Sequence, residues 1–220
     1  MKQRFQSLLM TSAATLALAG SLSACFPLLV GGAAVGAMVA VDRRTSGAQL
    51  EDEGIELRGG GRVRDALGNR VRVDITSYNR QVLLTGQAGS EQDKQAVEQL
   101  MGRVENVRAV VNEIAVAGTT PSLQQRTNDT LITGKVKASF IDAKDLHANA
   151  FKVLTERGTV YLMGLVTQRE ADRATQITRT VSGVQRVVRI FEIVTEEELQ
   201  RLSREPRQPA PRPATAAPQS

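Results

Sequence analysis

Val82-Leu83-Leu84-Thr85-Gly86 and Val160-Tyr161-Leu162-Met163-Gly164 follow one pattern: a valine, then a leucine two residues later, then a glycine two residues after that. The two glycines lie 78 residues apart. Apolar and β-branched residues in a short run of this kind predict a β-strand at both places. The same strand pattern occurring twice indicates that the chain contains an internal repeat.

Other segments extend the repeat in both directions. The further matches are 104–111 with 181–188, Ile75 with Val153, and Gly61-Arg62-Val63-Arg64 with Gly134-Lys135-Val136-Lys137. The first match has an offset of 77 and the second an offset of 78. The last has an offset of 73, so it requires the two copies to differ more in length there. The chain is therefore predicted to hold two copies of one module, over residues 48–118 and 123–194.

Each copy is predicted to run helix, strand, strand, helix, strand. In the first copy we expect helices over 50–67 and 90–102, strands over 71–76, 81–87 and 107–116, and a turn over 77–80. In the second we expect helices over 124–141 and 168–181, strands over 149–154, 158–165 and 184–194, and a turn over 156–158. The fold class is α+β, in which the helices of each module pack on one face of a small mixed three-stranded sheet.

The first copy departs from this pattern at Gly59-Gly60-Gly61, which falls inside its opening helix. Each glycine costs a helix roughly 1 kcal/mol relative to alanine. We expect the helix either to kink there or to begin only at Gly61, and the first module to be the less stable one. Residues 195–220 are expected to form a short capped helix to about Ser203, followed by a proline-rich disordered tail.

The amino terminus has the order of a secretory signal peptide over residues 1–24: basic Lys2 and Arg4, an apolar run, and then small residues. Leu22-Ser23-Ala24-Cys25 resembles the lipobox of bacterial lipoproteins, which implies cleavage after Ala24 and lipidation of Cys25. Phe26 stands where an aspartate would signal retention in the inner membrane, so the resemblance implies an outer-membrane lipoprotein facing the periplasm. The alternative is an ordinary signal peptide with an incidental cysteine.

Residues 25–47 are expected to be the lipidated amino terminus and a tether rich in glycine and alanine. The apolar stretch within it, 26–41, has 16 residues. A membrane-spanning helix needs about 20.

The repeated module resembles the BON domain, through the strand pattern quoted above and the related segments 104–111 and 181–188. The strings 128–136, 161–171 and 181–184 are similar to the DolP (YraP)-like family of dual-BON outer-membrane lipoproteins, and the resemblance extends from the lipobox to about residue 194. It implies a palmitate-bearing anchor, phospholipid binding and a role in the integrity of the cell envelope.

The helix 124–141 carries two kinds of face. Its core face holds Ile132, Val136, Ser139, Phe140 and Ala143. At about 100° per residue, the centre of that stripe lies more than 100° from Leu131. Measured from Leu131, Lys135 falls at about +40°, Ala138 at about −20°, Gly134 at about −60° and Ile141 at about −80°, all off the core face. Leu131 and Ile141 form an apolar pair beside the cation of Lys135, which suits partial insertion between anionic headgroups. The alternative is that Leu131 and Ile141 pack against the first module or are scattered surface residues.

The resemblance favours the first interpretation, because in the DolP-like family this helix binds anionic phospholipid. It assigns Leu131, Gly134, Lys135, Ala138 and Ile141 as the phospholipid-binding residues. The family has tryptophan where this chain has Leu131, and leucine lacks the ring that favours the membrane interface. Binding is therefore expected to be weaker here.

Composition excludes several other functions. Loss of Lys2 and Arg4 leaves 26 basic against 23 acidic residues, a net charge of +3 and too mild to argue for nucleic acid. Cys25 and His147 are the only residues of their types, so neither a metal site, a cofactor nor a catalytic triad is expected. Gly59-Gly60-Gly61 has no preceding strand and no following Lys-Ser/Thr, so it is not a phosphate loop. We expect no enzyme and no small-molecule substrate.

Two functions remain. The favoured one is a lipid-anchored periplasmic protein that binds anionic phospholipid through its second BON domain and supports outer-membrane integrity. The alternative is a chaperone-like or scaffold protein of envelope biogenesis, which would act on envelope-assembly proteins through sheet edges or helix faces.

Overall fold

The computed structural model describes residues 42–116 and 121–204. The expected signal peptide, Cys25, most of the tether and the proline-rich tail lie outside these residues. Module 1 comprises α2 (Ser46–Leu67), η1 (Gly68–Arg70), β1 (Val71–Tyr78), β2 (Gln81–Ala88), α3 (Glu91–Gly102), β3 (Ala109–Asn112) and β4 (Ala115–Val116). Module 2 comprises α4 (Leu123–Asp142), η2 (Ala148–Ala150), β5 (Phe151–Glu156), β6 (Thr159–Val166), α5 (Gln168–Thr180) and β7 (Arg186–Ile193). A final helix, α6 (Glu196–Arg204), follows.

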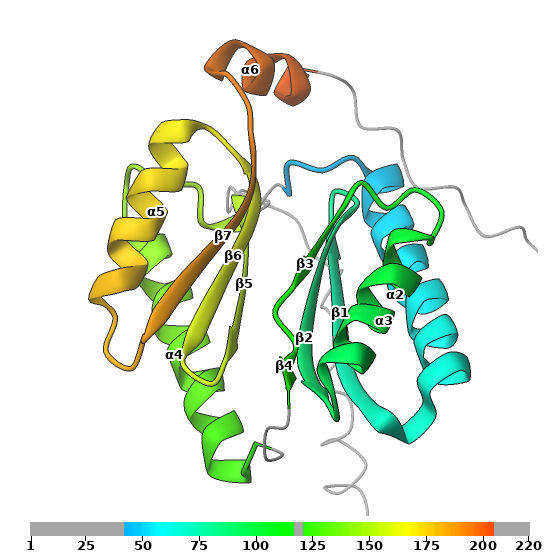
Figure 1. Ribbon diagram of the computed structural model, residues 1–220. Coiled ribbons are helices and arrows are strands. Elements are labelled where there is room, and N and C mark those ends of the chain that lie inside the picture. Colours follow the sequence, from blue (N-terminus) through cyan, green and yellow to red (C-terminus); the bar gives the residue numbers. More distant parts are fainter. Residues whose placement is uncertain (1–41, 117–120, 205–220) are drawn as a thin grey trace, which may run out of the picture. The chain divides into compact units, whose positions relative to one another are not determined.

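Each module has the predicted α+β architecture with a mixed sheet. The first two strands form an antiparallel hairpin, and the last strand of the module pairs in parallel with the second. Helices α2 and α3 cover one face of the first sheet, and α4 and α5 cover one face of the second (Figure 1). The predicted fold class is confirmed.

Module 1 differs from the prediction in having four strands. Its last strand is interrupted at Glu113 and Ile114, so that β3 and β4 pair separately with β2. At the interruption the N–H of Glu113 donates to the Leu84 carbonyl, and the N–H of Ile114 donates to the Asn112 side chain. The first hairpin turn is also shorter than predicted, because β1 and β2 extend to Tyr78 and Gln81 and leave only Asn79 and Arg80 in the turn.

The repeated glycines are required by the close approach of the two hairpin strands. A Cβ atom on Gly86 would overlap the Arg72 carbonyl oxygen, and Gly86 has φ of 105°. A Cβ atom on Gly164 would lie 2.6 Å from the Ala150 carbonyl oxygen. Backbone atoms cannot move aside as a flexible side chain can, so both positions exclude any residue with a Cβ.

Helix α2 runs without interruption through its three glycines, so the expectation that it begins only at Gly61 is wrong. Gly59 is buried, and a Cβ atom there would overlap the side chain of Met101 on α3. Met101 is itself fully buried. The glycine therefore makes room for the methionine, and this packing between helices offsets its low helix propensity.

The structure also corrects the alignment of the opening helices. The buried residues of α2 at positions 55, 59 and 63 correspond to those of α4 at 132, 136 and 140, always with an offset of 77. The match of Gly61–Arg64 with Gly134–Lys137 is thus displaced by one helical turn. In the corrected alignment Met101 corresponds to Thr178. Module 1 therefore combines a small residue, Gly59, with a large one, Met101, where module 2 has Val136 and Thr178.

The second faces of the two sheets pack against each other. Tyr78 and Leu83 of module 1 share a buried apolar cluster with five residues of module 2: Tyr161, Met163, Leu165, Ile190 and Val194. Burial is the main cause that raises the pKa of both Tyr78 and Tyr161 to about 12, so both phenols stay neutral. Ion pairs at the margin join Arg108 to Glu192 and Arg186 to Glu113.

A short segment before α2 binds both modules through adjacent residues. Arg43 forms a bidentate pair with Glu170 of α5, at 2.7 and 2.8 Å, and also donates to the Leu165 carbonyl. Arg44 donates to Asp52 of α2 at 2.6 Å, and its guanidinium carbon lies 4.2 Å from the centre of the Tyr78 ring. We call Asp42–Arg44 the arginine strap. From the sequence alone, this segment is expected to be part of the tether over residues 25–47.

The first prediction concerns the repeated glycines. Gly86→Ala and Gly164→Ala are each expected to destabilise the protein by about 2 kcal/mol or more, because the new methyl group meets a main-chain carbonyl. Urea unfolding followed by circular dichroism measures this change. The matched control is Gly60→Ala, which has open space in α2 and is expected to stabilise by about 1 kcal/mol. Equal effects at all three positions would contradict the argument.

The second prediction concerns the arginine strap. Burial is the largest influence on the Glu170 carboxyl and raises its pKa, but hydrogen bonds from Arg43 and the Thr167 N–H outweigh it. The net pKa therefore lies below the usual 4.5. Arg43→Met leaves a carboxylate that is 2% exposed without its partner, which should cost about 3 kcal/mol near pH 7.

Because the folded pKa of Glu170 is lowered, the stability that it contributes is complete above pH 4.5 and is lost as the pH falls through the folded value. In Arg43→Met burial is no longer opposed by the guanidinium, so the variant protonates Glu170 at a higher pH than wild type does. The difference in stability between the two proteins should therefore shrink as the pH falls from the folded pKa of the variant to that of wild type, in urea titrations. The control, Arg189→Met, removes an exposed ion pair with Asp172 and should cost less than about 1 kcal/mol at any pH. A pH-independent penalty for Arg43→Met would refute the assignment.

Candidate membrane-binding face

Helix α4 is held in place by its cap and by one buried stripe. The Ser122 hydroxyl accepts from the Gln125 N–H, and the Gln125 side chain accepts from the Ser122 N–H, which forms a capping box. Ile132, Val136 and Phe140 are buried against the sheet of module 2. Ser139, placed on the same face by the sequence, is half-buried, and its hydroxyl donates to the Lys135 carbonyl.

Asp129 ties this helix to the hairpin that follows it. Its carboxylate accepts from the N–H groups of Arg157 and Gly158, at 2.8 and 2.9 Å, in a turn where both residues have positive φ. Asp52 occupies the same position in module 1 and accepts from the N–H groups of Asn79 and Arg80. Neither aspartate is among the residues predicted from the sequence, although their spacing of 77 residues marks them as a repeated pair.

The opposite side of α4 is exposed, as the helical spacing predicts. Leu131 is 56% exposed and Ile141 is 73% exposed, so the alternative in which they pack against module 1 is wrong. Gly134, Lys135 and Ala138 are exposed between them. The structure adds Leu123, which is 81% exposed in the first turn and projects at the same angle as Ile141. We call these six residues the outer face of α4.

This outer face extends along the whole helix. From Leu123 to Ile141 the axial distance is about 27 Å at 1.5 Å per residue. A pocket of about 530 Å³ lies beside its amino-terminal half, lined by Leu131 and Lys135, by polar side chains such as Asn128 and Gln185, and by the main chain near Gly183. Apolar groups, a cation and hydrogen-bonding groups therefore lie next to one another on one side of module 2.

Helix α2 has exposed leucines as well, but a different charge. Leu50 and Leu57 are exposed on α2. That helix carries five acidic and three basic residues, whereas α4 carries two acidic and three basic residues. A net charge of −2 on α2 and +1 on α4 makes α4 the better match for a negatively charged surface.

Other kinds of site have little support among residues 42–116 and 121–204. This part of the chain holds no group of three histidine, cysteine, aspartate or glutamate residues that could bind a metal ion. His147 is exposed in the loop after α4. Across the described helices, none combines the length and apolar character needed to cross a membrane.

The architecture described above defines a class of protein, one with two tandem BON domains. A family model for the BON domain matches residues 61–118 and 128–195. The chain therefore belongs to the BON domain family.

Individual relatives refine this class. The chain is 38% identical over 173 residues to outer membrane lipoprotein DolP of Haemophilus influenzae, covering 77% of this chain and 89% of that protein. It is 33% identical over 156 residues to a 21 kDa hemolysin of Actinobacillus pleuropneumoniae, covering 70% and 80%. The chain is thus a DolP-like dual-BON lipoprotein associated with the outer membrane of the bacterial envelope. Neither relative has the name of an enzyme.

A solved structure of CdsD, a structural protein of the type III secretion system of Chlamydia trachomatis, aligns with 71% of this chain and 98% of its own. With 14% identity and a TM-score of 0.28, this likeness is too low to support any conclusion about this chain.

The third prediction concerns Asp129, which ties α4 to the turn between β5 and β6. Asp129→Ala removes the acceptor of two turn N–H groups and should destabilise the protein by about 2 kcal/mol. The matched control, Asp142→Ala, changes an exposed aspartate at the end of the same helix and should have almost no effect. Thermal and urea unfolding measure both. Similar losses from the two variants would contradict the role of Asp129.

Proposed function

We propose that this protein is anchored to the outer membrane through lipidated Cys25, faces the periplasm, and binds anionic phospholipid through the outer face of α4. In this way it supports the integrity of the outer membrane. The observation that carries the proposal is the combination of three exposed apolar side chains, Leu123, Leu131 and Ile141, with Lys135 on one face of a rigid helix.

Small residues between the apolar side chains favour close contact with a membrane. Gly134 and Ala138 project little, so Leu131 and Ile141 stand out from the helix and can enter the headgroup layer. Burying one leucine side chain contributes about 1.5–3 kcal/mol when burial is complete. A lysine near an anionic membrane surface adds about 1 kcal/mol.

The pocket beside Leu131 offers a place for the polar part of the same lipid. Lys135 would meet the phosphate, and the amide side chains of Asn128 and Gln185 would donate to headgroup oxygens. Asp129 also lines the pocket, but its carboxylate already accepts from two main-chain N–H groups, which reduces its repulsion of a phosphate. A leucine at position 131 keeps the apolar contact and provides no ring for the interface.

The lipid anchor and the outer face would act together. An anchor at Cys25 holds module 2 at a high local concentration near the membrane, so the second contact can be weak and still be occupied. On this proposal the anchor supplies location, while α4 supplies preference for anionic lipid.

The fourth prediction tests this contact without the anchor. Residues 42–204 mixed with vesicles should co-sediment when the vesicles contain phosphatidylglycerol and fail to do so with phosphatidylcholine alone. Leu131→Glu should weaken the partition about tenfold, because it removes apolar insertion and adds a repelled charge. Raising the salt concentration should weaken binding only in part, since apolar insertion is not screened.

The matched control is Leu57→Glu, which makes the same change at an exposed leucine of α2. It should leave the partition unchanged. The proposal fails if wild-type protein does not co-sediment with anionic vesicles, or if Leu57→Glu and Leu131→Glu weaken binding equally.

A further inference from the structure

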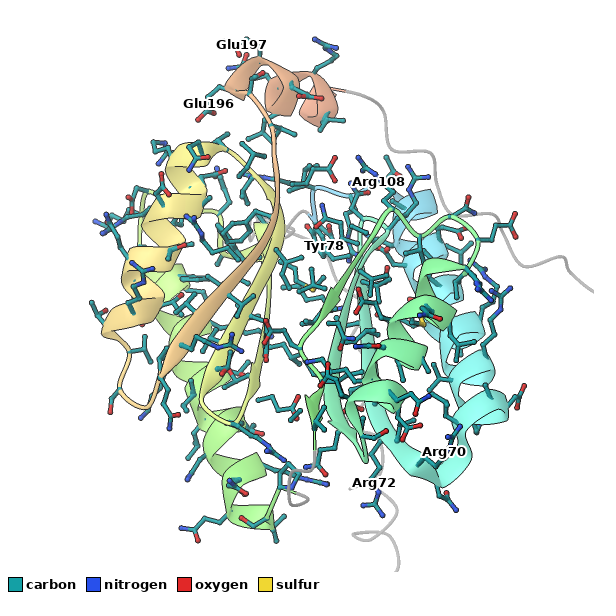
Figure 2. The ribbon with its side chains drawn as sticks, viewed as in Figure 1. Arg70, Arg72, Tyr78, Arg108, Glu196 and Glu197 are labelled. Atoms are coloured by element: carbon teal, nitrogen blue, oxygen red, sulfur yellow. The ribbon has the colours of Figure 1, made fainter. Side chains whose placement is uncertain are left out.

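In module 1 the buried apolar cluster between the two sheets lies at one end of the sheet, where β1 ends and β2 begins. Tyr78, at one end of β1, belongs to the buried cluster, whereas Arg72 lies near the other end of the same strand (Figure 2). Beyond the cluster is a groove of about 650 Å³. Its walls come from β1, β2, β5 and α4, and we call it the inter-sheet groove. This volume lies within the roughly 300–1,000 Å³ range typical of ligand sites.

Strand β1 presents a main-chain edge to this groove. The Gly89 N–H donates to the Arg70 carbonyl, so these two opposite residues form a hydrogen-bonded pair. Along an antiparallel ladder, pairs of opposite residues alternate between hydrogen-bonded and non-hydrogen-bonded. The main-chain groups of Arg72, Asp74 and Thr76 therefore bond to β2. The N–H and C=O groups of Val71, Val73, Ile75 and Ser77 therefore point away from β2. As β1 pairs with no other strand in the described residues, these groups form an edge that no strand covers.

Contacts at Ser77 support this assignment. Its N–H donates to Glu56 at 2.7 Å, and its carbonyl accepts from Lys152 at 3.2 Å. One end of the β1 edge is thus covered by side chains. At Val73, which lines the groove, the outward main-chain groups have no such cover among the hydrogen bonds of the described residues.

Strand β5 presents a second edge to the same groove. The two-residue turn between β5 and β6 is flanked by Glu156 and Thr159, which form a hydrogen-bonded pair. Because bonded and non-bonded pairs alternate along the hairpin, the main-chain groups of Val153 and Thr155 point away from β6. Four consecutive residues, 153–156, line the groove. Because successive side chains of a strand point to opposite faces, consecutive lining residues indicate that the groove faces the edge of the strand.

We infer that the inter-sheet groove binds an extended polypeptide segment, which pairs with the β1 edge. An open strand edge is a template for another strand, and proteins use this mode to bind extended peptides. Charges of both signs line the groove: Arg72 and Arg126 against Asp74, Asp129 and Glu156. They suit a chain with mixed charges better than an anionic lipid. The groove also continues directly from the established packing between the two sheets.

This inference is independent of the lipid proposal. The groove is formed by sheet edges and by the side of α4 that carries Thr130 and Thr133, whereas the outer face of α4 does not line it. The two sites can therefore be disabled separately. The segment bound would be supplied by an unfolded or extended part of another envelope protein.

The fifth prediction uses the full chain in a non-ionic detergent and a fluorescent, reduced and carboxymethylated α-lactalbumin as a permanently unfolded probe. Anisotropy titration should give saturable binding. Val73→Pro should weaken it at least tenfold, since proline removes an outward N–H that the β2 ladder does not use. Thr130→Trp should also weaken it at least tenfold, by filling the groove from α4.

The matched control is Thr127→Trp, which places the same side chain on α4 at an exposed position outside the groove and should bind the probe like wild type. If Val73→Pro fails to fold, the comparison of Thr130→Trp with Thr127→Trp tests the inference by itself. Absence of binding by wild type, or equal affinity for all variants, overturns the inference. A dimer in sedimentation analysis that Thr130→Trp abolishes would assign the edge to a second copy and overturn it as well.

Discussion

Packing of one sheet face against another is the constraint on which the rest of the structure depends. Each small sheet has two faces, and its own helices cover only one of them. The second faces carry Tyr78 and Leu83 in module 1 and Tyr161 and Met163 in module 2, which are too apolar to remain in water. Their mutual burial makes the two BON domains partners within one chain. Since the helices pack on the other faces of the sheets, their outer sides remain exposed, and the outer face of α4 is available to a partner.

The charged contacts reinforce this packing at its margins. Arg43 and Arg44 are adjacent in the sequence yet bind different modules, so the segment that precedes α2 helps to hold the modules together. Glu170 serves both the cap of α5 and the strap, because its carboxylate accepts from Thr167 and from Arg43. A carboxylate buried this deeply is stable only while its partners remain. The strap is thus part of the folded structure, although composition alone makes it resemble a linker.

The two candidate sites follow from different physical features. The outer face of α4 combines exposed leucine and isoleucine side chains with a positive helix, which matches an anionic membrane surface. The inter-sheet groove instead offers main-chain edges and mixed charges, which match an extended polypeptide. Both arise because the sheets are small: in module 1 the apolar cluster covers only one end of the sheet, and short sheets have a large share of edge strands. A protein tethered to a membrane would be able to use both at once.

The sequence by itself determined the repeat, the order of the elements and the exposure of Leu131 and Ile141, because these depend on local periodicity and on glycines that no other residue can replace. It did not determine the continuity of α2, since only Met101 of a neighbouring helix explains why Gly59 is tolerated. The alignment of α2 with α4, the turn-binding aspartates and the arginine strap were likewise decided by tertiary structure. The deciding partners lie tens of residues away in the chain: Met101 for Gly59, the hairpin turns for the two aspartates, and Glu170 for Arg43. Long-range packing or a buried carboxylate therefore overrides what local propensity predicts.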